Sequence, residues 1–140
     1  MKALIAYATK SGAARECAEL LATRLPNAEL CDLYAGSPDI SEFDTIIIGS
    51  GVRMGRIYKP LRKFMQDNLG ALTAKRLAIY LCNGSAEAFP EIVDKNIAPE
   101  LAASAICVLS FGGRMPTKEG RSSEWMLTEN IESLITCVTA

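Results

Sequence analysis

The 140-residue sequence contains no histidine. That absence excludes catalytic triads built on histidine, zinc sites with histidine ligands and a histidine general base. The five cysteines are scattered among apolar residues, and no two of them form a C-x-x-C pair. An odd number of cysteines at such spacings predicts reduced, mostly buried thiols, as in a cytoplasmic protein.

The sequence also lacks an excess of one charge and any long apolar run. Its 15 basic residues nearly balance its 16 acidic residues, so charge gives no reason to expect nucleic acid or an anionic membrane as a partner. No apolar stretch reaches membrane-spanning length, and the run after Lys2 is too short for a signal peptide. Hydrophobic residues make up 49% of the chain, which predicts one domain with a full core over residues 1–140.

Residues 2–25 predict a strand, a turn and a helix in immediate succession. Ala3–Tyr7 is an apolar run without alternation, which is typical of a strand covered on both faces in a parallel sheet. Small and hydroxylated residues replace that run at Ala8–Gly12. A helical pattern begins directly afterwards. Its expected buried side comprises Ala13, Cys17, Leu20, Leu21, Arg24 and Leu25.

The turn between this strand and this helix predicts an anion site. A helix N-terminus carries unpaired backbone N–H groups and the positive end of the helix dipole. Thr9 and Ser11 add hydroxyl groups, and Gly12 lets the backbone come close to a phosphate. The alternative is an ordinary cap, in which Ser11 accepts a hydrogen bond from the N–H of Ala14. The position after the first buried strand favours the phosphate site, although the loop contains neither a Walker A sequence nor a G-x-G-x-x-G fingerprint.

Four more strands are expected along the chain. Ala28–Leu33 carries two acidic residues and predicts an edge strand, whereas the β-branched run Asp44–Gly49 predicts a central strand. Arg76–Cys82 and Ala105–Phe111 predict the remaining two strands. The loop between residues 34 and 43 is expected to contain one helical turn after Pro38.

Helices are expected between these strands. One should begin near Pro60 and end at Gly70, and a broken helix should cover Phe89–Lys95 and Pro99–Ala103. A polar loop is expected at residues 114–121. Ser122 or Ser123 should then cap the last helix, whose apolar positions repeat at helical spacing: Leu127, Ile131, Leu134, Ile135 and Val138.

Two of the loops resemble those of a known family. Thr9–Ala14 is similar to the phosphate loop of flavodoxins, approximately Thr-x-Thr-Gly-x-Thr, and departs from it at Ala14. The later pattern Gly-Ser-x-x-Arg-x-Gly, with Phe64 in the following helix, most resembles the flavodoxin-type protoporphyrinogen dehydrogenases of bacteria. Met54 stands where that branch often has an aromatic residue.

Five strands that alternate with helices imply an α/β fold, a doubly wound parallel sheet in three layers, and the resemblance implies the flavodoxin-like strand order 2-1-3-4-5. Its ligand site would lie beyond the carboxyl ends of strands 1 and 3. The resemblance also implies FMN as cofactor, in electron transfer or in a flavin-dependent oxidoreductase acting on a redox partner protein or a small anionic or quinone-type substrate. The implied cofactor-binding residues are Thr9, Lys10, Ser11, Gly12, Ala13, Ala14, Ser50, Gly51, Val52, Arg53, Met54, Gly55, Asn83, Gly84 and Ser85.

A receiver domain shares the topology, but its acidic and lysine positions are filled here by Ala8–Thr9, Ser50–Gly51 and Gly112–Gly113, so that class is excluded.

Two questions of function stay open. A flavodoxin-like binding module that has lost its flavin remains an alternative. The chain also has one concentrated basic stretch, either a solvated face or a surface that attracts an anion. It consists of Arg53, Arg56, Lys59, Arg62 and Lys63.

Overall fold

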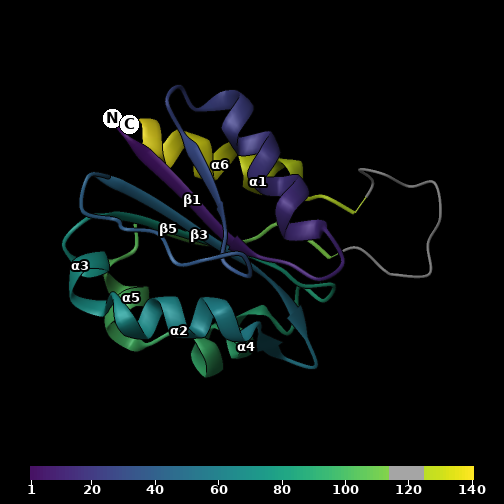
Figure 1. Cartoon of the computed structure of the whole chain (residues 1–140). Helices are drawn as coiled ribbons and strands as arrows, with labels where there is room; N and C mark the ends of the chain where they lie inside the picture. Colours follow the sequence, from purple (N-terminus) through teal and green to yellow (C-terminus); the bar gives the residue numbers. More distant parts are fainter. Residues whose placement is uncertain (114–124) are drawn as a thin grey trace.

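The computed structural model describes residues 1–113 and 125–140, and a twisted sheet lies at its centre (Figure 1). Within those residues, five parallel strands follow the order β2-β1-β3-β5-β6, and the short strand β4 pairs antiparallel with β3. With β4 set aside, this order confirms the predicted order 2-1-3-4-5. The strands are β1 (Ala3–Ala8), β2 (Glu29–Asp32), β3 (Thr45–Arg53), β4 (Arg56–Ile57), β5 (Arg76–Cys82) and β6 (Cys107–Ser110).

Burial explains why the central strands have unbroken apolar sequences. Every residue of β1 is buried, as are the first seven residues of β3 and all of β5 after Arg76. The strand β2 lies at the sheet edge and leaves Leu30 42% exposed. The predictions of a central third strand and an edge second strand are therefore confirmed.

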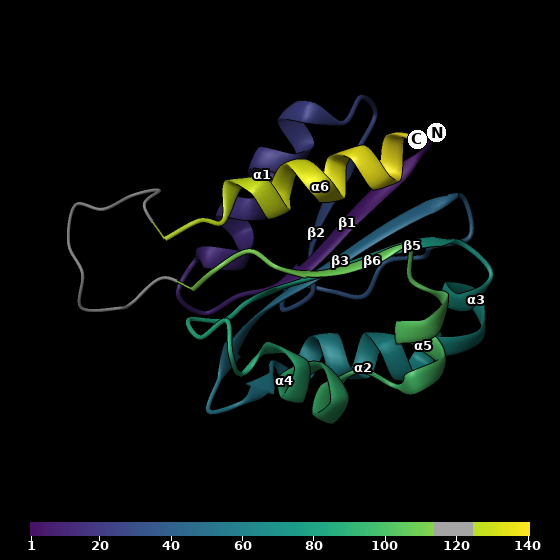
Figure 2. The same ribbon diagram turned by 180° about the vertical axis from the view of Figure 1, so that it is seen from behind.

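Helices cover both faces of the sheet. Figures 1 and 2 show α1 and α6 on one face and α2 to α5 on the other, with the two chain ends close together. The first face buries Ile5, Tyr80 and Phe111, and the second buries Leu4, Ile48 and others. This is the predicted three-layer α/β fold. The helices are α1 (Ala13–Arg24), α2 (Lys59–Asp67), α3 (Leu69–Thr73), α4 (Phe89–Asn96), α5 (Pro99–Ser104) and α6 (Thr128–Thr139).

Three local predictions are wrong. The helix expected to end at Gly70 ends at Asp67, because Asn68 leaves the helical conformation (φ −121°) and its side-chain amide donates to the carbonyl of Phe64; Gly70 lies inside α3. No helix follows Pro38, where the Asp39 carboxylate accepts a hydrogen bond from the N–H of Ser41 and forms a local turn. Leu20 and Arg24, both expected on the buried side of α1, are exposed.

The last helix differs in its first turn. It begins at Thr128, and Leu127 is an exposed N-cap rather than a core residue. Ile131, Leu134, Ile135 and Val138 are buried as predicted. The polar loop expected at residues 114–121 and the capping serines Ser122 and Ser123 lie outside the described residues.

Candidate cofactor site

The loops that follow β1, β3 and β5 meet at the carboxyl edge of the sheet, where they line a cleft of about 510 Å³. We call it the phosphate-loop cleft. It lies where β1 and β3 run side by side and the chain leaves them toward opposite faces of the sheet, which is the switch point at which open α/β sheets bind ligands. Its lining residues are Lys10, Ser11, Ala13, Gly51, Val52, Arg53, Tyr58, Cys82, Gly84 and Gly113.

The turn after β1 is held by its own side chains. The hydroxyl of Thr9 accepts a hydrogen bond from the N–H of Gly12 at 2.9 Å, and Ser11 Oγ accepts one from the N–H of Ala13 at 3.4 Å. Gly12, not Ser11, is the N-cap of α1 and has φ 93°, a left-handed conformation that favours glycine. Thr9 and Ser11 thus set the shape of the loop by accepting from the N–H groups of Gly12 and Ala13 at the start of α1.

The first turn of α1 also rests on the core. The side chains of Ala13 and Ala14 are buried, and the carbonyl of Ala14 accepts a hydrogen bond from the hydroxyl of Tyr80 at 2.8 Å. Tyr80 is fully buried, and its ring stacks on Phe111 with centroids 4.6 Å apart. Ala13 and Ala14 can thus offer a ligand only their backbone groups.

The second predicted loop is a β-hairpin instead. Ser50–Arg53 extends β3, and Arg53 pairs with Arg56 of β4 across a two-residue turn, Met54-Gly55. Both turn residues have positive φ, 53° and 77°, as a type I′ turn requires. Residues 50–55, expected as a loop after the third strand, are therefore the end of β3 and a tight hairpin turn.

The side chain of Asn96, on α4, fixes this hairpin. Its amide oxygen accepts from the N–H of Ile57 at 3.2 Å, and its nitrogen donates to the carbonyls of Gly55 and Ile92 at 2.8 Å each. Ser50 is buried at the base of the hairpin, where its hydroxyl accepts from the N–H of Tyr58 and donates to the carbonyl of Gly51. Ser50 thus supports the hairpin and does not face the cleft.

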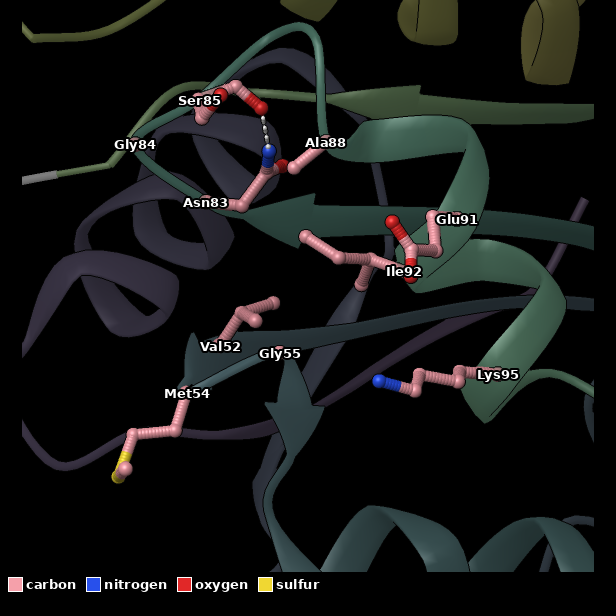
Figure 3. A pocket seen from close by; sticks show the side chains of 10 residues that line it. All are labelled: Val52, Met54, Gly55, Asn83, Gly84, Ser85, Ala88, Glu91, Ile92 and Lys95. Carbon is pink, nitrogen blue, oxygen red and sulfur yellow. Dashed lines mark hydrogen bonds between the residues drawn. The ribbon is translucent and has the colours of Figure 1, made fainter.

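A second cleft of about 330 Å³ adjoins the first and shares Val52 and Gly84 with it. We call it the hairpin cleft. Figure 3 shows Glu91, Ile92 and Lys95 of α4 on one side and hairpin residues on the other, with the side chain of Met54 pointing away. Met54 is 93% exposed. The lining residues are Val52, Met54, Gly55, Asn83, Gly84, Ser85, Ala88, Glu91, Ile92 and Lys95.

The third predicted loop, residues 83–85, forms the wall between the two clefts. The side chain of Asn83 is 4% exposed and is used within the protein: it donates to the carbonyl of Ser85 at 2.6 Å and accepts from the hydroxyl of Ser110 at 2.8 Å. A Cβ on Gly113 would lie only 2.5 Å from the backbone nitrogen of Gly84, so the two backbones lie in direct contact. The loop therefore presents backbone groups to a ligand.

Tyr58 is the main cleft residue that the sequence analysis missed. Its ring lines the phosphate-loop cleft, and the Lys10 ammonium lies 5.2 Å from the ring centroid. Burial raises the pKa of the Tyr58 hydroxyl; the neighbouring Tyr34 adds to that rise, and Arg53 opposes it. The signal for Tyr58 was its place as an aromatic residue immediately before the α2 helix start.

The residues of the basic stretch differ in whether their charged groups have a partner. Arg62 donates to the carbonyl of Ile57 at 2.7 Å, and Lys63 pairs with Asp67 at 2.7 Å. Arg53 and Arg56 flank the hairpin turn, are exposed and have no ion-pair partner within the described ranges. Within the described residues, the charges of this stretch without an ion-pair partner are therefore Arg53 and Arg56 at the hairpin and Lys59 at the start of α2.

The sequence also matches a known protein family. Residues 4–124 match the family model described as Flavodoxin domain. The chain belongs to the flavodoxin-domain family. A curated relative of this flavodoxin-domain protein, the protoporphyrinogen IX dehydrogenase [quinone] of Escherichia coli K12, is 27% identical over 88 residues, which cover 59% of this chain and 49% of the relative. The chain spans about half the length of the curated relatives it matches.

Solved structures share the fold. A flavoprotein from Lactobacillus acidophilus, in complex with FMN, matches with TM-score 0.56 and 18% identity over 78% of this chain and 92% of that one. Oxidised flavodoxin 2 from Bacillus cereus matches with TM-score 0.58 and 19% identity over 99% and 98%. These comparisons and the family model confirm the predicted resemblance to flavodoxins and the fold class.

All five cysteines lie in the described ranges and carry free thiols; only Cys17 and Cys82 are buried and the other three are half-buried, so the thiols are less buried than predicted. In residues 1–113 and 125–140, no helix is long and apolar enough to cross a membrane, and no cluster of three acidic or thiol side chains could hold a metal ion.

Proposed function

We propose that this flavodoxin-domain protein binds one FMN across the two adjoining clefts and uses it in redox chemistry. The observation that carries the proposal is the meeting of the three loops, after β1, β3 and β5, around continuous clefts at the switch point. The clefts share Val52 and Gly84, so one elongated ligand can extend from the phosphate loop to the hairpin.

The donors of the phosphate loop fit the phosphate end of FMN. The hydroxyls of Thr9 and Ser11, the first N–H groups of α1 and the ammonium of Lys10 are all groups that bind a dianion. In this proposal Ala13 and Ala14 contribute only backbone donors, because their side chains are buried. Gly12 permits the close approach of the backbone.

The ring end would lie between the hairpin and residues 83–85. Val52 offers an apolar contact, Tyr58 an aromatic one, and the backbone N–H groups of Gly84 and Ser85 can donate to ring oxygens. Asn83 holds that loop in place through Ser85 and Ser110. When bound, FMN supplies the reversible uptake of electrons, and the protein supplies binding, orientation and electrostatics.

The finer proposal is an FMN-dependent oxidoreductase that acts on a small anionic or quinone-type substrate or on a redox partner protein in the cytoplasm. The exposed Arg53 and Arg56 support it, because unpaired cations beside the ring attract anionic molecules. The similarity to the quinone-linked Escherichia coli enzyme also supports it. The five free thiols agree with a reducing compartment.

A second candidate function is a binding module that has lost its flavin. One observation favours it: Ala14 stands where flavodoxins usually have a third phosphate-binding hydroxyl, and its methyl group is buried in the core. A methyl group cannot donate a hydrogen bond to a phosphate oxygen. The module would still bind partners or small ligands through the same edge of the sheet.

Purification of the full chain distinguishes the two functions. We expect a yellow protein whose absorbance spectrum is that of a flavin, or a colourless protein that becomes yellow when FMN is added and the excess is removed. Chromatography of the cofactor released by heat should identify FMN, at one per chain. A protein that stays colourless after incubation with FMN would contradict the proposal and support the binding module.

A further inference from the structure

A third hollow, of about 480 Å³, lies between α2 and the segment that follows β2. We call it the tyrosine groove. Its floor is apolar, because Leu33 and Phe64 are 8% and 2% exposed and belong to the core. It shares no lining residue with either cleft of the cofactor site. The lining residues are Leu33, Tyr34, Ala35, Gly36, Ser37, Lys59, Pro60, Lys63, Phe64 and Asp67.

The groove presents an aromatic surface that is fixed in place. Tyr34 is 46% exposed, its backbone N–H donates to the carboxylate of Asp32 at 2.9 Å, and its ring lies against that of Tyr58 with centroids 6.4 Å apart. The hydrogen bond holds the backbone of Tyr34 and the Tyr58 ring limits the movement of its side chain, so Tyr34 loses little conformational freedom when a planar ligand stacks on it. The Tyr34 hydroxyl makes no hydrogen bond to any residue in the described ranges and is free to serve as a polar contact.

The charged side chains at the rim of the groove determine whether it favours an anionic or a cationic ligand. Lys63 is neutralised by Asp67, with Nζ and the carboxylate 2.7 Å apart. Lys59 lines the same groove and has no hydrogen-bond or ion-pair partner within residues 1–113 and 125–140. One unpaired ammonium beside an apolar floor and an aromatic wall complements a molecule with one negative charge and one ring.

We infer that the tyrosine groove binds a small aromatic carboxylate, with the ring against Tyr34 and Phe64 and the carboxylate at Lys59. This site is distinct from the proposed FMN site and does not depend on it. The pair of Tyr34 and Tyr58 lies between them, since Tyr58 lines the phosphate-loop cleft and Tyr34 lines the groove. A ligand stacked on Tyr34 would therefore lie one aromatic residue away from the cofactor cleft.

The test is isothermal titration of the full chain with 2-naphthoate and with its neutral analogue 2-naphthylmethanol, in the absence and presence of saturating FMN. We expect 2-naphthoate to bind one to one and more tightly than the alcohol, whether or not FMN is present. Lys59→Gln should weaken 2-naphthoate binding by roughly three- to fivefold, the size expected of one exposed charge, and leave the alcohol unaffected. Lys95→Gln, the same charge change in the hairpin cleft, is the matched control and should alter neither affinity.

A second variant tests the position without changing charge. A Cβ on Gly36 would meet no atom within 4 Å, so the backbone there accepts a side chain, and Gly36→Leu adds bulk at the groove. It should abolish binding of 2-naphthoate while the melting temperature stays unchanged. Equal binding of acid and alcohol, equal effects of Lys59→Gln and Lys95→Gln, displacement by FMN, or no binding at millimolar concentration would each overturn the inference. FMN binding can succeed or fail independently of all these results.

Discussion

Replacing Gly49 with alanine is expected to lower the free energy of unfolding by about 3 kcal/mol, at the upper end of the cost of overpacking a core. Gly49 lies in the middle of β3, directly beside Tyr80 of β5. A Cβ at Gly49 would overlap the Tyr80 ring itself. That ring cannot move aside, because it is fully buried, stacks on Phe111 and donates its hydroxyl to the carbonyl of Ala14.

Urea unfolding measures this effect, and two further variants control for it. Gly70→Ala introduces the same methyl group in α3, where nothing lies within 4 Å, and should be neutral or stabilising by roughly 0.5–1 kcal/mol. In a Tyr80→Leu background, Gly49→Ala should cost much less than in the native chain, since the two positions are in contact. Equal costs in both backgrounds would show that Tyr80 is not the obstacle.

Replacing Thr9 with valine is expected to weaken FMN binding by roughly 10- to 150-fold, equivalent to about 1.5–3 kcal/mol for one charge-assisted hydrogen bond. The Thr9 hydroxyl accepts from the N–H of Gly12 at 2.9 Å and keeps its own proton to donate to a phosphate oxygen. Valine has the same shape but removes both functions. Fluorescence titration of the apoprotein with FMN gives the affinity directly.

Thr23→Val is the matched control for this prediction. Thr23 lies on the exposed last turns of the same helix, where its hydroxyl donates to the carbonyl of Leu20, far from the clefts. Its substitution should leave FMN affinity unchanged. Ser11→Ala separates the two interpretations of the loop: a loss of affinity supports the phosphate site, whereas a loss of about 1 kcal/mol in apoprotein stability with unchanged affinity supports the cap.

The parallel sheet was predictable because its determinants are local. Buried strands such as Arg76–Cys82 have nearly unbroken apolar sequences, and this one is followed by the polar and small residues Asn83, Gly84 and Ser85. These patterns also located the loops at residues 9–14, 50–55 and 83–85, which the structure brings to one edge. Their roles as cofactor ligands stay predictions.

The hairpin was not predictable for a physical reason. Its turn places Met54 at positive φ, an unusual conformation for a long side chain and one that no local pattern indicates. The hydrogen bonds that fix it come from Asn96, about 40 residues later in the chain. The local periodicity of a sequence carries no information on such long-range contacts. The pattern of Ser50–Gly55 therefore predicts only a loop.

Long-range contacts also explain why some polar side chains have a different role from the one predicted. Ser50 and Asn83 are polar residues near strand ends, and this position favours contact with a ligand. In the structure the Ser50 hydroxyl accepts from the N–H of Tyr58. The Asn83 amide donates to the carbonyl of Ser85 and accepts from the hydroxyl of Ser110. Whether a polar side chain faces a ligand or supports a loop depends on partners supplied by other elements.

The most direct test of the central claim is a titration of apoprotein with FMN and with riboflavin, which differ only in the phosphate. If the loop at residues 9–14 binds that phosphate, FMN should bind one to one and at least roughly tenfold more tightly, the smallest effect expected of one charge-assisted hydrogen bond. The preference should shrink in Thr9→Val. Equal affinities for FMN and riboflavin would contradict a phosphate site at the N-terminus of α1.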